Sequence, residues 1–178
     1  ASRTAAAIDA GVTVRAGGLL DVEDEGAYDL AIAFDGVLWS LESHAERVDA
    51  AGRLRRALRP GGALLVEGPN MSWLLYANRE LPVRSELYHR ATVVCLPQQD
   101  HDFHDGVLEH RDTIVVQVDE REAAEWNETR RLALLGLPFL QAAIEAGGFE
   151  GIETFGDFRA TGPERIMGER IVLTARAT

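Results

Sequence analysis

A strand–helix–strand unit is the feature of this sequence that most limits its fold. Residues 28–34 (YDLAIAF) form a nearly continuous apolar run, which is typical of a strand buried on both faces of a parallel sheet. Ser43 and Glu46 have the spacing of a capping box and predict a helix that Pro60-Gly61-Gly62 ends. Residues 63–67 (ALLVE) then form a second buried strand. The unit predicts two parallel strands joined by a right-handed crossover.

The remaining segments extend this unit into one α/β domain. No internal repeat and no low-complexity linker interrupts the chain, so we interpret residues 1–178 as a single domain. The other predicted elements are a helix tail over 3–10, a strand over 12–16, partial helix over 71–86, an antiparallel strand pair over 91–96 and 108–119, helices over 122–131 and 138–147, and strands over 152–155 and 171–175.

Composition narrows the classes of function. The chain carries a formal net charge of −11, and all 18 of its basic residues are arginine. The absence of lysine from the sequence excludes Schiff-base chemistry and the Walker phosphate site. An acidic chain disfavours nucleic acid as a partner, and no apolar run approaches the roughly 18 residues that cross a bilayer. The single cysteine, Cys95, has strand-like apolar neighbours and predicts a buried, unreactive thiol in a reducing compartment.

Residues 58–66 (LRPGGALLV) resemble class I S-adenosylmethionine-dependent methyltransferases, in which a helix ending in L-x-P-G-G leads into the fifth strand. Upstream, residues 10–12, 15–22 and 28–34 resemble the third strand, the adenine-side loop and the fourth strand of that family. Downstream, residues 143–149, 152–158 and 171–176 resemble its closing helix, sixth strand and antiparallel seventh strand.

The resemblance implies a Rossmann-like α/β fold in three layers, α/β/α. The sheet would be mostly parallel with an antiparallel last strand. A small antiparallel β hairpin would be inserted, and residues 71–119 are the expected insertion on the substrate side.

The cofactor implied by the resemblance is S-adenosylmethionine, but the sequence departs from the family in the cofactor segment. The first strand of the family and its G-x-G-x-G loop would precede Ser2. Residues 1–178 contain no equivalent of this strand and loop. We expect about two strand–helix units, roughly 60 residues, in that place. The acidic residue that grips the ribose is also absent. Gly18 stands where the family often has aspartate, so contact with adenine would fall to backbone groups around Leu19 or to Asp21.

Ligands of open α/β sheets bind beyond the carboxyl ends of the strands, and the resemblance assigns residues there to the cofactor and the methyl acceptor. Leu19 and Leu20 would pack near adenine, whereas Phe34 and Asp35 would border the transferring methyl group. Asp35 is equally well explained as a turn residue. The predicted cofactor-binding residues are Gly18, Leu19, Leu20, Phe34, Asp35 and Gly36; the predicted acceptor-binding residues are Trp39, Asn70, Trp73 and Tyr76.

Plain packing or a turn is the alternative explanation for each of these acceptor residues. An aromatic residue at the position of Trp39 is as often an ordinary core residue as part of a site. Asn70 could hold the acceptor or simply shape a turn. Trp73 and Tyr76 have the spacing of one helical face and suit either an acceptor pocket or packing.

Residues 100–106 (DHDFHDG), followed by His110, gather histidines and carboxylates in one part of the chain. Asp105-Gly106 is a hairpin turn signature, and a solvated loop tip explains the whole cluster. His104 or His101 is our candidate for a catalytic general base, because imidazole titrates near neutrality. A metal site at His101 and His104 is an alternative, but no metal is predicted.

Together these interpretations predict a bacterial, cytoplasmic methyltransferase that acts on oxygen or nitrogen of a small molecule. Nucleic acid and membranes are not expected as partners, whereas a homodimer is compatible with the sequence. Two alternatives stay open. One is a non-catalytic methyltransferase-like domain used for binding or assembly, whose exposed sheet edge a partner covers. The other is a metal-dependent enzyme centred on His101 and His104.

Overall fold

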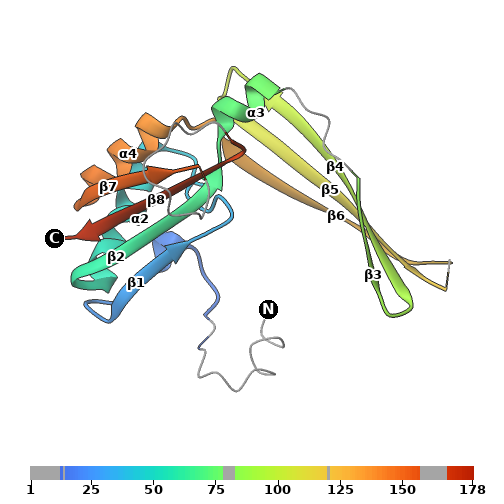
Figure 1. The fold of residues 1–178 in the computed structure, drawn as a ribbon, viewed down its shortest axis with the longest axis horizontal. Helices are drawn as coiled ribbons and strands as arrows, with labels where there is room; N and C mark the ends of the chain where they lie inside the picture. Colours follow the sequence, from blue (N-terminus) through green and yellow to red (C-terminus); the bar gives the residue numbers. More distant parts are fainter. Residues whose placement is uncertain (1–12, 14, 78–82, 120, 157–167) are drawn as a thin grey trace.

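The computed structural model describes residues 13, 15–77, 83–119, 121–156 and 168–178, and its strands form two four-stranded sheets (Figure 1). The first sheet has the order β1-β2-β8-β7 and the second the order β3-β4-β5-β6. In chain order the elements are η1 (Leu19–Asp21), β1 (Tyr28–Ala33), α2 (His44–Ala57), β2 (Leu58–Pro69), α3 (Met71–Ala77), β3 (Arg84–Tyr88), β4 (Ala91–Asp102), β5 (Val107–Val118), β6 (Arg121–Ala133), α4 (Leu137–Ala146), β7 (Phe149–Phe155) and β8 (Arg170–Ala177).

The first sheet contains the predicted strand–helix–strand unit. β1 and β2 are parallel, and α2 connects them. The capping box is confirmed, because the Ser43 hydroxyl accepts a hydrogen bond from the Glu46 backbone N–H at 3.1 Å. The Glu46 carboxylate accepts one in return from the Ser43 backbone N–H at 3.0 Å. β8 runs antiparallel to both β2 and β7, which confirms the antiparallel last strand.

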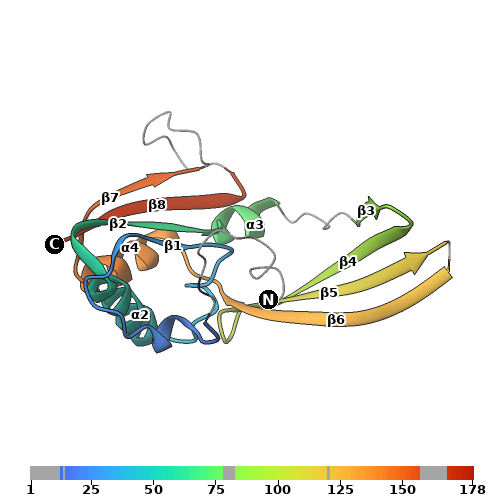
Figure 2. The same ribbon diagram turned by 90° about the horizontal axis from the view of Figure 1, so that it is seen from below.

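Helices α2 and α4 cover the same face of the first sheet (Figure 2). The core between them and the sheet contains Leu54 of α2, Leu64 of β2, Ile144 of α4 and Leu173 of β8. Full burial of side chains of this size contributes about 1.5–3 kcal/mol each. Among the described residues no helix covers the opposite face of this sheet.

The prediction that the strand at residues 28–34 is buried on both faces is wrong for the described part of the chain. Tyr28, Leu30 and Ile32 are 44%, 49% and 53% exposed, and Phe34 just beyond β1 is 47% exposed. Ala33, on the other face, is buried under the helices. The exposed side chains alternate along the strand because one face of β1 meets the core and no described element covers the other.

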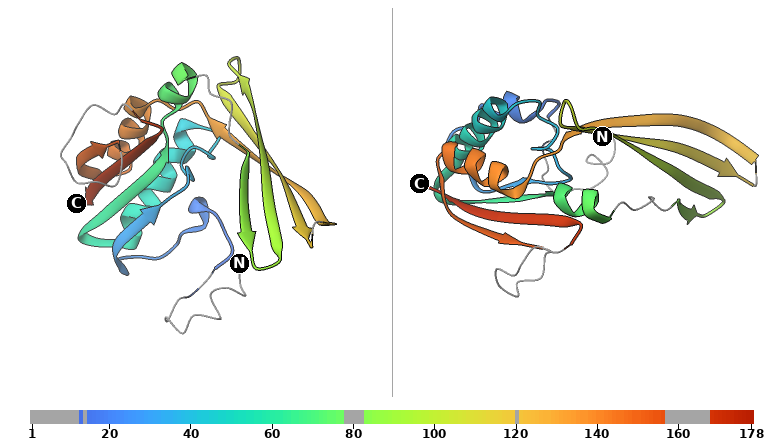
Figure 3. Two further views of the ribbon diagram at one scale, coloured as in Figure 1. Left: turned by 45° about the vertical axis from the view of Figure 1, so that its right-hand side comes forward. Right: turned by 90° about the horizontal axis from the view of Figure 1, so that it is seen from above.

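The second sheet is antiparallel and projects away from the first (Figure 3). β4 and β5 pair over their full length, which confirms the predicted pairing of residues 91–96 with 108–119. Gly106 in the connecting turn has φ +66°, a left-handed conformation that glycine adopts without strain. The sheet is larger than the expected hairpin because β3 and β6 add one strand on each side.

The helix predicted over residues 122–131 is wrong, because this segment lies in β6. The sequence REAAEWNETR is rich in helix-forming residues and lacks a clear alternation. Pairing with β5 overrides that propensity, and β6 lies at the edge of the sheet with most of its residues exposed.

The other predicted elements fall into two groups. The helices in residues 71–86 and from Pro138 to Gly147 are confirmed as α3 and α4, and β7 confirms the strand at residues 152–155. The helix tail over 3–10 lies outside the described residues, as does part of the strand over 12–16, whose described residues are in no strand. No described helix is long and apolar enough to span a membrane.

Candidate active site

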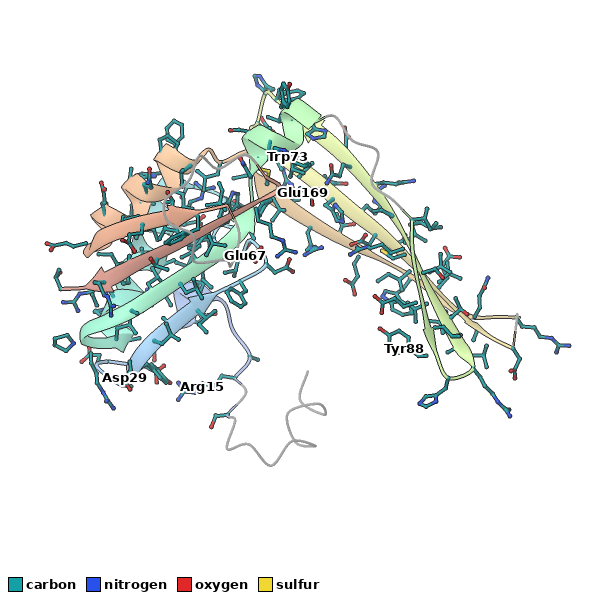
Figure 4. All side chains as sticks on the ribbon, viewed as in Figure 1. Arg15, Asp29, Glu67, Trp73, Tyr88 and Glu169 are labelled. Atoms are coloured by element: carbon teal, nitrogen blue, oxygen red, sulfur yellow. The ribbon has the colours of Figure 1, made fainter. Side chains whose placement is uncertain are left out.

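The two sheets meet at a cavity of about 220 Å³ beyond the carboxyl ends of β1 and β2. This is the edge at which open α/β sheets bind their ligands. Figure 4 shows Glu169 and Trp73 where the sheets join and Glu67 at the end of β2. The cavity is lined by Asp35, Glu67, Gly68, Pro69, Leu74, Gln99, Leu108, His110, Arg130, Leu132, Glu169 and Arg170.

The buried carboxylate of Glu67 organises the wall that the first sheet contributes. Its Oε2 accepts a hydrogen bond from the Asp35 backbone N–H at 3.0 Å, and its backbone carbonyl accepts one from Gly36 at 3.1 Å. Its Oε1 accepts one from Arg170 Nη1 at 2.7 Å. Glu67, the last residue of β2 with a long side chain, therefore fixes the turn that follows β1.

The turn after β1 has an unusual backbone. Asp35 has φ +56° and Gly36 has φ +71°, both in the left-handed region. A Cβ added to Gly36 would lie 3.0 Å from Cδ of Pro69, so the turn itself accounts for glycine at this position.

The second sheet contributes a histidine–aspartate pair on β5. His110 Nε2 lies 3.0 Å from Asp112 Oδ2, and both side chains are largely buried, at 13% and 8% exposure. The other ring nitrogen, Nδ1, lies 3.3 Å from Gln99 Nε2. Asp112 is an acceptor when ionised and the Gln99 amide nitrogen is a donor. The network therefore assigns the proton to Nε2 and leaves the lone pair of Nδ1 toward the amide of Gln99, which also lines the cavity.

Asp112 is held ionised by its neighbours. Burial alone would raise the pKa of Asp112, but the hydrogen bond from Cys95, the interaction with His110 and the charge of Arg84 together lower it. Cys95 Sγ donates to Asp112 Oδ1 at 3.1 Å. Burial and then this hydrogen bond raise the pKa of Cys95. The thiol is therefore protonated at neutral pH, as expected of an unreactive cysteine.

Arg130 of β6 connects the two walls of the cavity. Its Nη1 donates to Asp35 Oδ2 at 2.8 Å, and its Nη2 lies 3.7 Å from Asp112 Oδ2. The carboxylate of Asp35, predicted to border the cofactor, is therefore engaged with the second sheet.

The predicted cofactor residues occupy two places along the chain. Leu19 and Leu20 lie in η1 and pack in part against the core, and the Gly18 backbone N–H donates to the Asp21 carboxylate at 2.7 Å. Asp21, which was expected as an alternative to the backbone around Leu19 for contact with adenine, is therefore engaged in its own turn. The exposed part of Phe34 adds apolar surface at the end of β1. Of the predicted cofactor residues, Asp35 alone lines the cavity between the sheets, and the described residues contain no glycine-rich loop.

Three of the predicted acceptor residues line a second cavity, of about 380 Å³. Asn70, Trp73 and Tyr76 border it together with Leu137 and Pro138 of α4. Asn70 is only 7% exposed, and its side chain is occupied by the backbone. Its Oδ1 accepts from the Trp73 N–H at 3.3 Å, and its Nδ2 donates to the Gly168 carbonyl at 2.9 Å. That arrangement favours the alternative explanation of Asn70 as a turn residue.

The fourth predicted acceptor residue, Trp39, lies in the core. Its side chain is 0% exposed, and within the described part of the chain its Nε1 has no hydrogen-bond partner. A Cβ added to Gly68 would lie 2.4 Å from its ring, so the indole is packed tightly against β2. This placement favours packing over contact with an acceptor.

The structure does not bring the two predicted catalytic histidines to either cavity. His104 is exposed at the tip of the β4–β5 hairpin, where its backbone N–H donates to Asp102 Oδ1 at 2.9 Å. His101 stacks on Phe103, with ring centroids 5.8 Å apart. Within the described ranges no three His, Cys, Asp or Glu side chains are placed to hold a metal ion. The solvated-turn explanation accounts for the cluster.

Sequence reasoning did not single out Glu67 and Arg130 of the cavity or Asp112, which pairs with His110, and it noted His110 only as the residue that follows the hairpin cluster. One signal was present, because Leu108, His110, Asp112 and Ile114 alternate along one face of a predicted strand. Two polar residues between apolar ones on a strand face indicate a polar site. The register that sets Gln99 and Arg130 beside His110 was not predicted, because the expected strand over 91–96 ends before Gln99 and residues 122–131 have the composition of a helix.

Comparison with solved structures shows that the chain has the fold of class I S-adenosylmethionine-dependent methyltransferases. The CcbJ methyltransferase from Streptomyces caelestis is 20% identical, with a TM-score of 0.74 over 99% of this chain and 69% of that one. A sugar N-methyltransferase from Streptoalloteichus is 17% identical, with a TM-score of 0.72 over 97% and 65%. A methyltransferase from Clostridium acetobutylicum is 10% identical, with a TM-score of 0.71 over 91% and 63%.

At these identities the likeness establishes the fold alone. No protein-family model matches the sequence, and no curated protein matches it. The chain spans 63% of the Clostridium acetobutylicum structure and 69% of the Streptomyces caelestis one.

Proposed function

We propose that the protein is a bacterial, cytoplasmic methyltransferase that moves a methyl group from S-adenosylmethionine to oxygen or nitrogen of a small molecule. One observation carries the proposal. The polar cavity beyond β1 and β2 lies at the edge where open α/β sheets bind ligands, and the second sheet borders it with His110, which is paired with Asp112. The three solved structures named above are described as methyltransferases, one of them as a sugar N-methyltransferase.

The cofactor would be held on one side by the residues that the sequence assigns to it. Gly18, Leu19 and Leu20 would contact the adenine side, and Phe34, Asp35 and Gly36 the methyl-bearing side. The bound sulfonium supplies an already activated methyl group, so the main task of the protein is to hold the acceptor in line with it. We include in the proposal a three-layer domain, in which the exposed face of β1 is covered, and residues 71–119 as its substrate-side insertion.

The acceptor would be a small polar molecule. Asp35, Glu67, Arg130 and Arg170 line the cavity, and their charges are paired with one another across it or along its first wall. Such a lining suits hydroxyl and amine groups better than an extended apolar chain. The more apolar cavity beside Trp73 and Tyr76 would accept a planar or apolar part of the molecule. A net charge of −11 disfavours nucleic acid.

Binding of S-adenosylhomocysteine to the full-length protein, measured by calorimetry, tests the cofactor. We expect saturable binding that Asp35→Ala and Gly36→Val weaken by at least about tenfold, or about 1.4 kcal/mol. Asp29→Ala is the matched control, because Asp29 is an exposed aspartate at the opposite end of β1 (Figure 4). A full-length protein with no affinity for S-adenosylhomocysteine would contradict the proposal.

One feature favours a second function, binding or assembly without catalysis. Tyr28, Leu30, Ile32 and Phe34 form an exposed apolar face on an edge strand, which is a surface that another chain can cover. A stable dimer that lacks affinity for S-adenosylhomocysteine is the result expected of this function. Light scattering of the same preparations measures it.

A further inference from the structure

We infer that His110 is the general base that removes the proton of the methyl acceptor in the cavity between the two sheets, and that Asp112 is its positioning residue. The inference rests on the proposed function and names a catalytic residue for it.

His110 lies at the carboxyl ends of β1 and β2. Its imidazole lines the cavity together with Asp35 and Glu67, which belong to the carboxyl ends of β1 and β2. The predicted residues for the transferring methyl group, Phe34 and Asp35, lie at the same strand end. A base on β5 therefore faces the place where donor and acceptor would meet, whereas His104 lies at a solvated hairpin tip.

The hydrogen bonds of the His110 ring leave one nitrogen free to take up a proton. Asp112 accepts from Nε2, so Nδ1 carries the lone pair that a base needs. Gln99 is the partner of Nδ1 in this structure, at a long 3.3 Å. An acceptor hydroxyl or amine would replace this weak contact, and the Gln99 amide would then hold the acceptor atom.

The charges around His110 and Asp112 favour a protonated imidazole beside an ionised carboxylate. Asp112 stabilises the imidazolium that forms when Nδ1 takes up a proton. The hydrogen bond from Cys95 and the proximity of Arg84 and Arg130 keep that carboxylate ionised and in place. The charged or titratable groups that face the pair are Arg84 from β3, Cys95 from β4, Glu128 and Arg130 from β6, Asp35 from the turn after β1, Glu67 from β2, and Glu169 and Arg170 at the start of β8.

The reaction balances with no further reactant. A lone pair of the acceptor oxygen or nitrogen forms the new bond to the methyl carbon, and the sulfur–methyl bond breaks with its electron pair going to sulfur. The acceptor proton goes to His110 Nδ1, and solvent later removes it. The products are the methylated acceptor, the thioether S-adenosylhomocysteine and one proton.

The tautomer of His110 tests the arrangement directly. Two-bond ¹H–¹⁵N spectra of the histidine-labelled full-length protein, assigned with His110→Gln, are expected to show Nε2 protonated and Nδ1 unprotonated above neutral pH. In Asp112→Asn the amide can donate to the ring, so we expect the Nδ1-protonated tautomer to appear. A wild-type His110 in the Nδ1-protonated tautomer would overturn the inference, whether or not the protein binds S-adenosylhomocysteine.

Single-turnover methyl transfer tests the chemistry, with methyl-labelled S-adenosylmethionine and a panel of small primary amines and alcohols as probes. His110→Gln is expected to lower the rate constant by about 10²–10⁴-fold and to remove the rise of the rate with pH. The Kd for S-adenosylhomocysteine is expected to change by no more than about twofold, which is well below a tenfold change in affinity. Added imidazole should restore part of the rate of His110→Ala, which a purely structural role does not predict.

His44→Gln is the control, because His44 is exposed at the first turn of α2. A His110→Gln variant that transfers methyl at the wild-type rate with an unchanged pH profile would overturn the role of His110 and leave the proposed function intact. Absence of cofactor binding by the wild-type protein would instead remove the proposed function.

Discussion

Gly68 sets the position of Trp39, the largest fully buried side chain of the described core. The glycine lies in β2, next to Glu67 of the cavity wall, and the indole packs directly on its backbone. Trp39 in turn accepts a hydrogen bond through its carbonyl from Ala133 at the end of β6, at 2.7 Å. The absence of a side chain at Gly68 thus allows Trp39 to pack on the first sheet, within the core, and to hold the end of the second sheet.

A Gly68→Ala substitution is expected to destabilise the protein by about 1–3 kcal/mol, because the added Cβ overpacks the core. It would lie 2.4 Å from Cζ3 of Trp39, closer than side chains approach one another. The measurement is the free energy of unfolding in urea. Gly52→Ala in α2 is the matched control. Its Cβ meets nothing nearer than 3.7 Å, and it should stabilise the helix by about 0.5–1 kcal/mol. Equal destabilisation by both substitutions would contradict this explanation.

At the scale of helices and strands, the sequence predicted the elements that are marked by local sequence signals. The capping box of Ser43 and Glu46 located the start of α2, and Pro138 and Gly147 located α4. β6 was missed because its identity depends on pairing with β5, a partner that local propensity does not reveal. The same missed pairing hid the candidate site, since Arg130 reaches Asp35 and Asp112 only through that register.

Arg47 shows the same limit within a correctly predicted helix. A helical arginine normally faces solvent, yet this one is 5% exposed, and burial lowers the pKa of Arg47 although the charge of Glu46 opposes the change. Its Nε donates to the Leu38 carbonyl at 3.2 Å and its Nη2 to the Leu41 carbonyl at 2.6 Å. Helix α2 thereby anchors the loop that follows β1.

Replacement of Arg47 by methionine is expected to cost about 1–3 kcal/mol of unfolding free energy, because it leaves buried carbonyl groups without a donor. Urea unfolding monitored by circular dichroism measures the change. Arg53→Met in the same helix is the control. The Arg53 side chain is partly exposed and pairs with Asp49, so its loss should change stability by less than about 1 kcal/mol. A cost for Arg53→Met as large as that for Arg47→Met would show that the two buried hydrogen bonds are unimportant.

At the scale of the whole molecule, two sheets of different character diverge from a common junction (Figure 1). The first is a mixed sheet covered by α2 and α4 on one face. Its other face carries the exposed side chains of Tyr28, Leu30, Ile32 and Phe34. Apolar surface gathered in this way tends to be covered by another part of a protein or by a partner.

A preparation of the 178-residue chain is therefore expected to bind a hydrophobic fluorescent dye through the face of β1. The double substitution Leu30→Thr and Ile32→Thr should lower the dye fluorescence while changing the unfolding free energy by no more than about 1 kcal/mol, because threonine also favours strands. Leu87→Thr, at an isolated exposed leucine of β3, should leave the fluorescence unchanged. Undiminished fluorescence of the double variant would place the dye elsewhere.

The second sheet occupies one uninterrupted stretch of the chain, from Arg84 to Ala133, between α3 and α4. None of the residues that the structure describes in this stretch takes part in the strand pairings of the first sheet. The second wall of the cavity is thus encoded by one contiguous segment, whereas the first wall is built from segments on both sides of it. Such a division allows substrate preference to diversify by replacement of one gene segment while the donor chemistry is inherited unchanged.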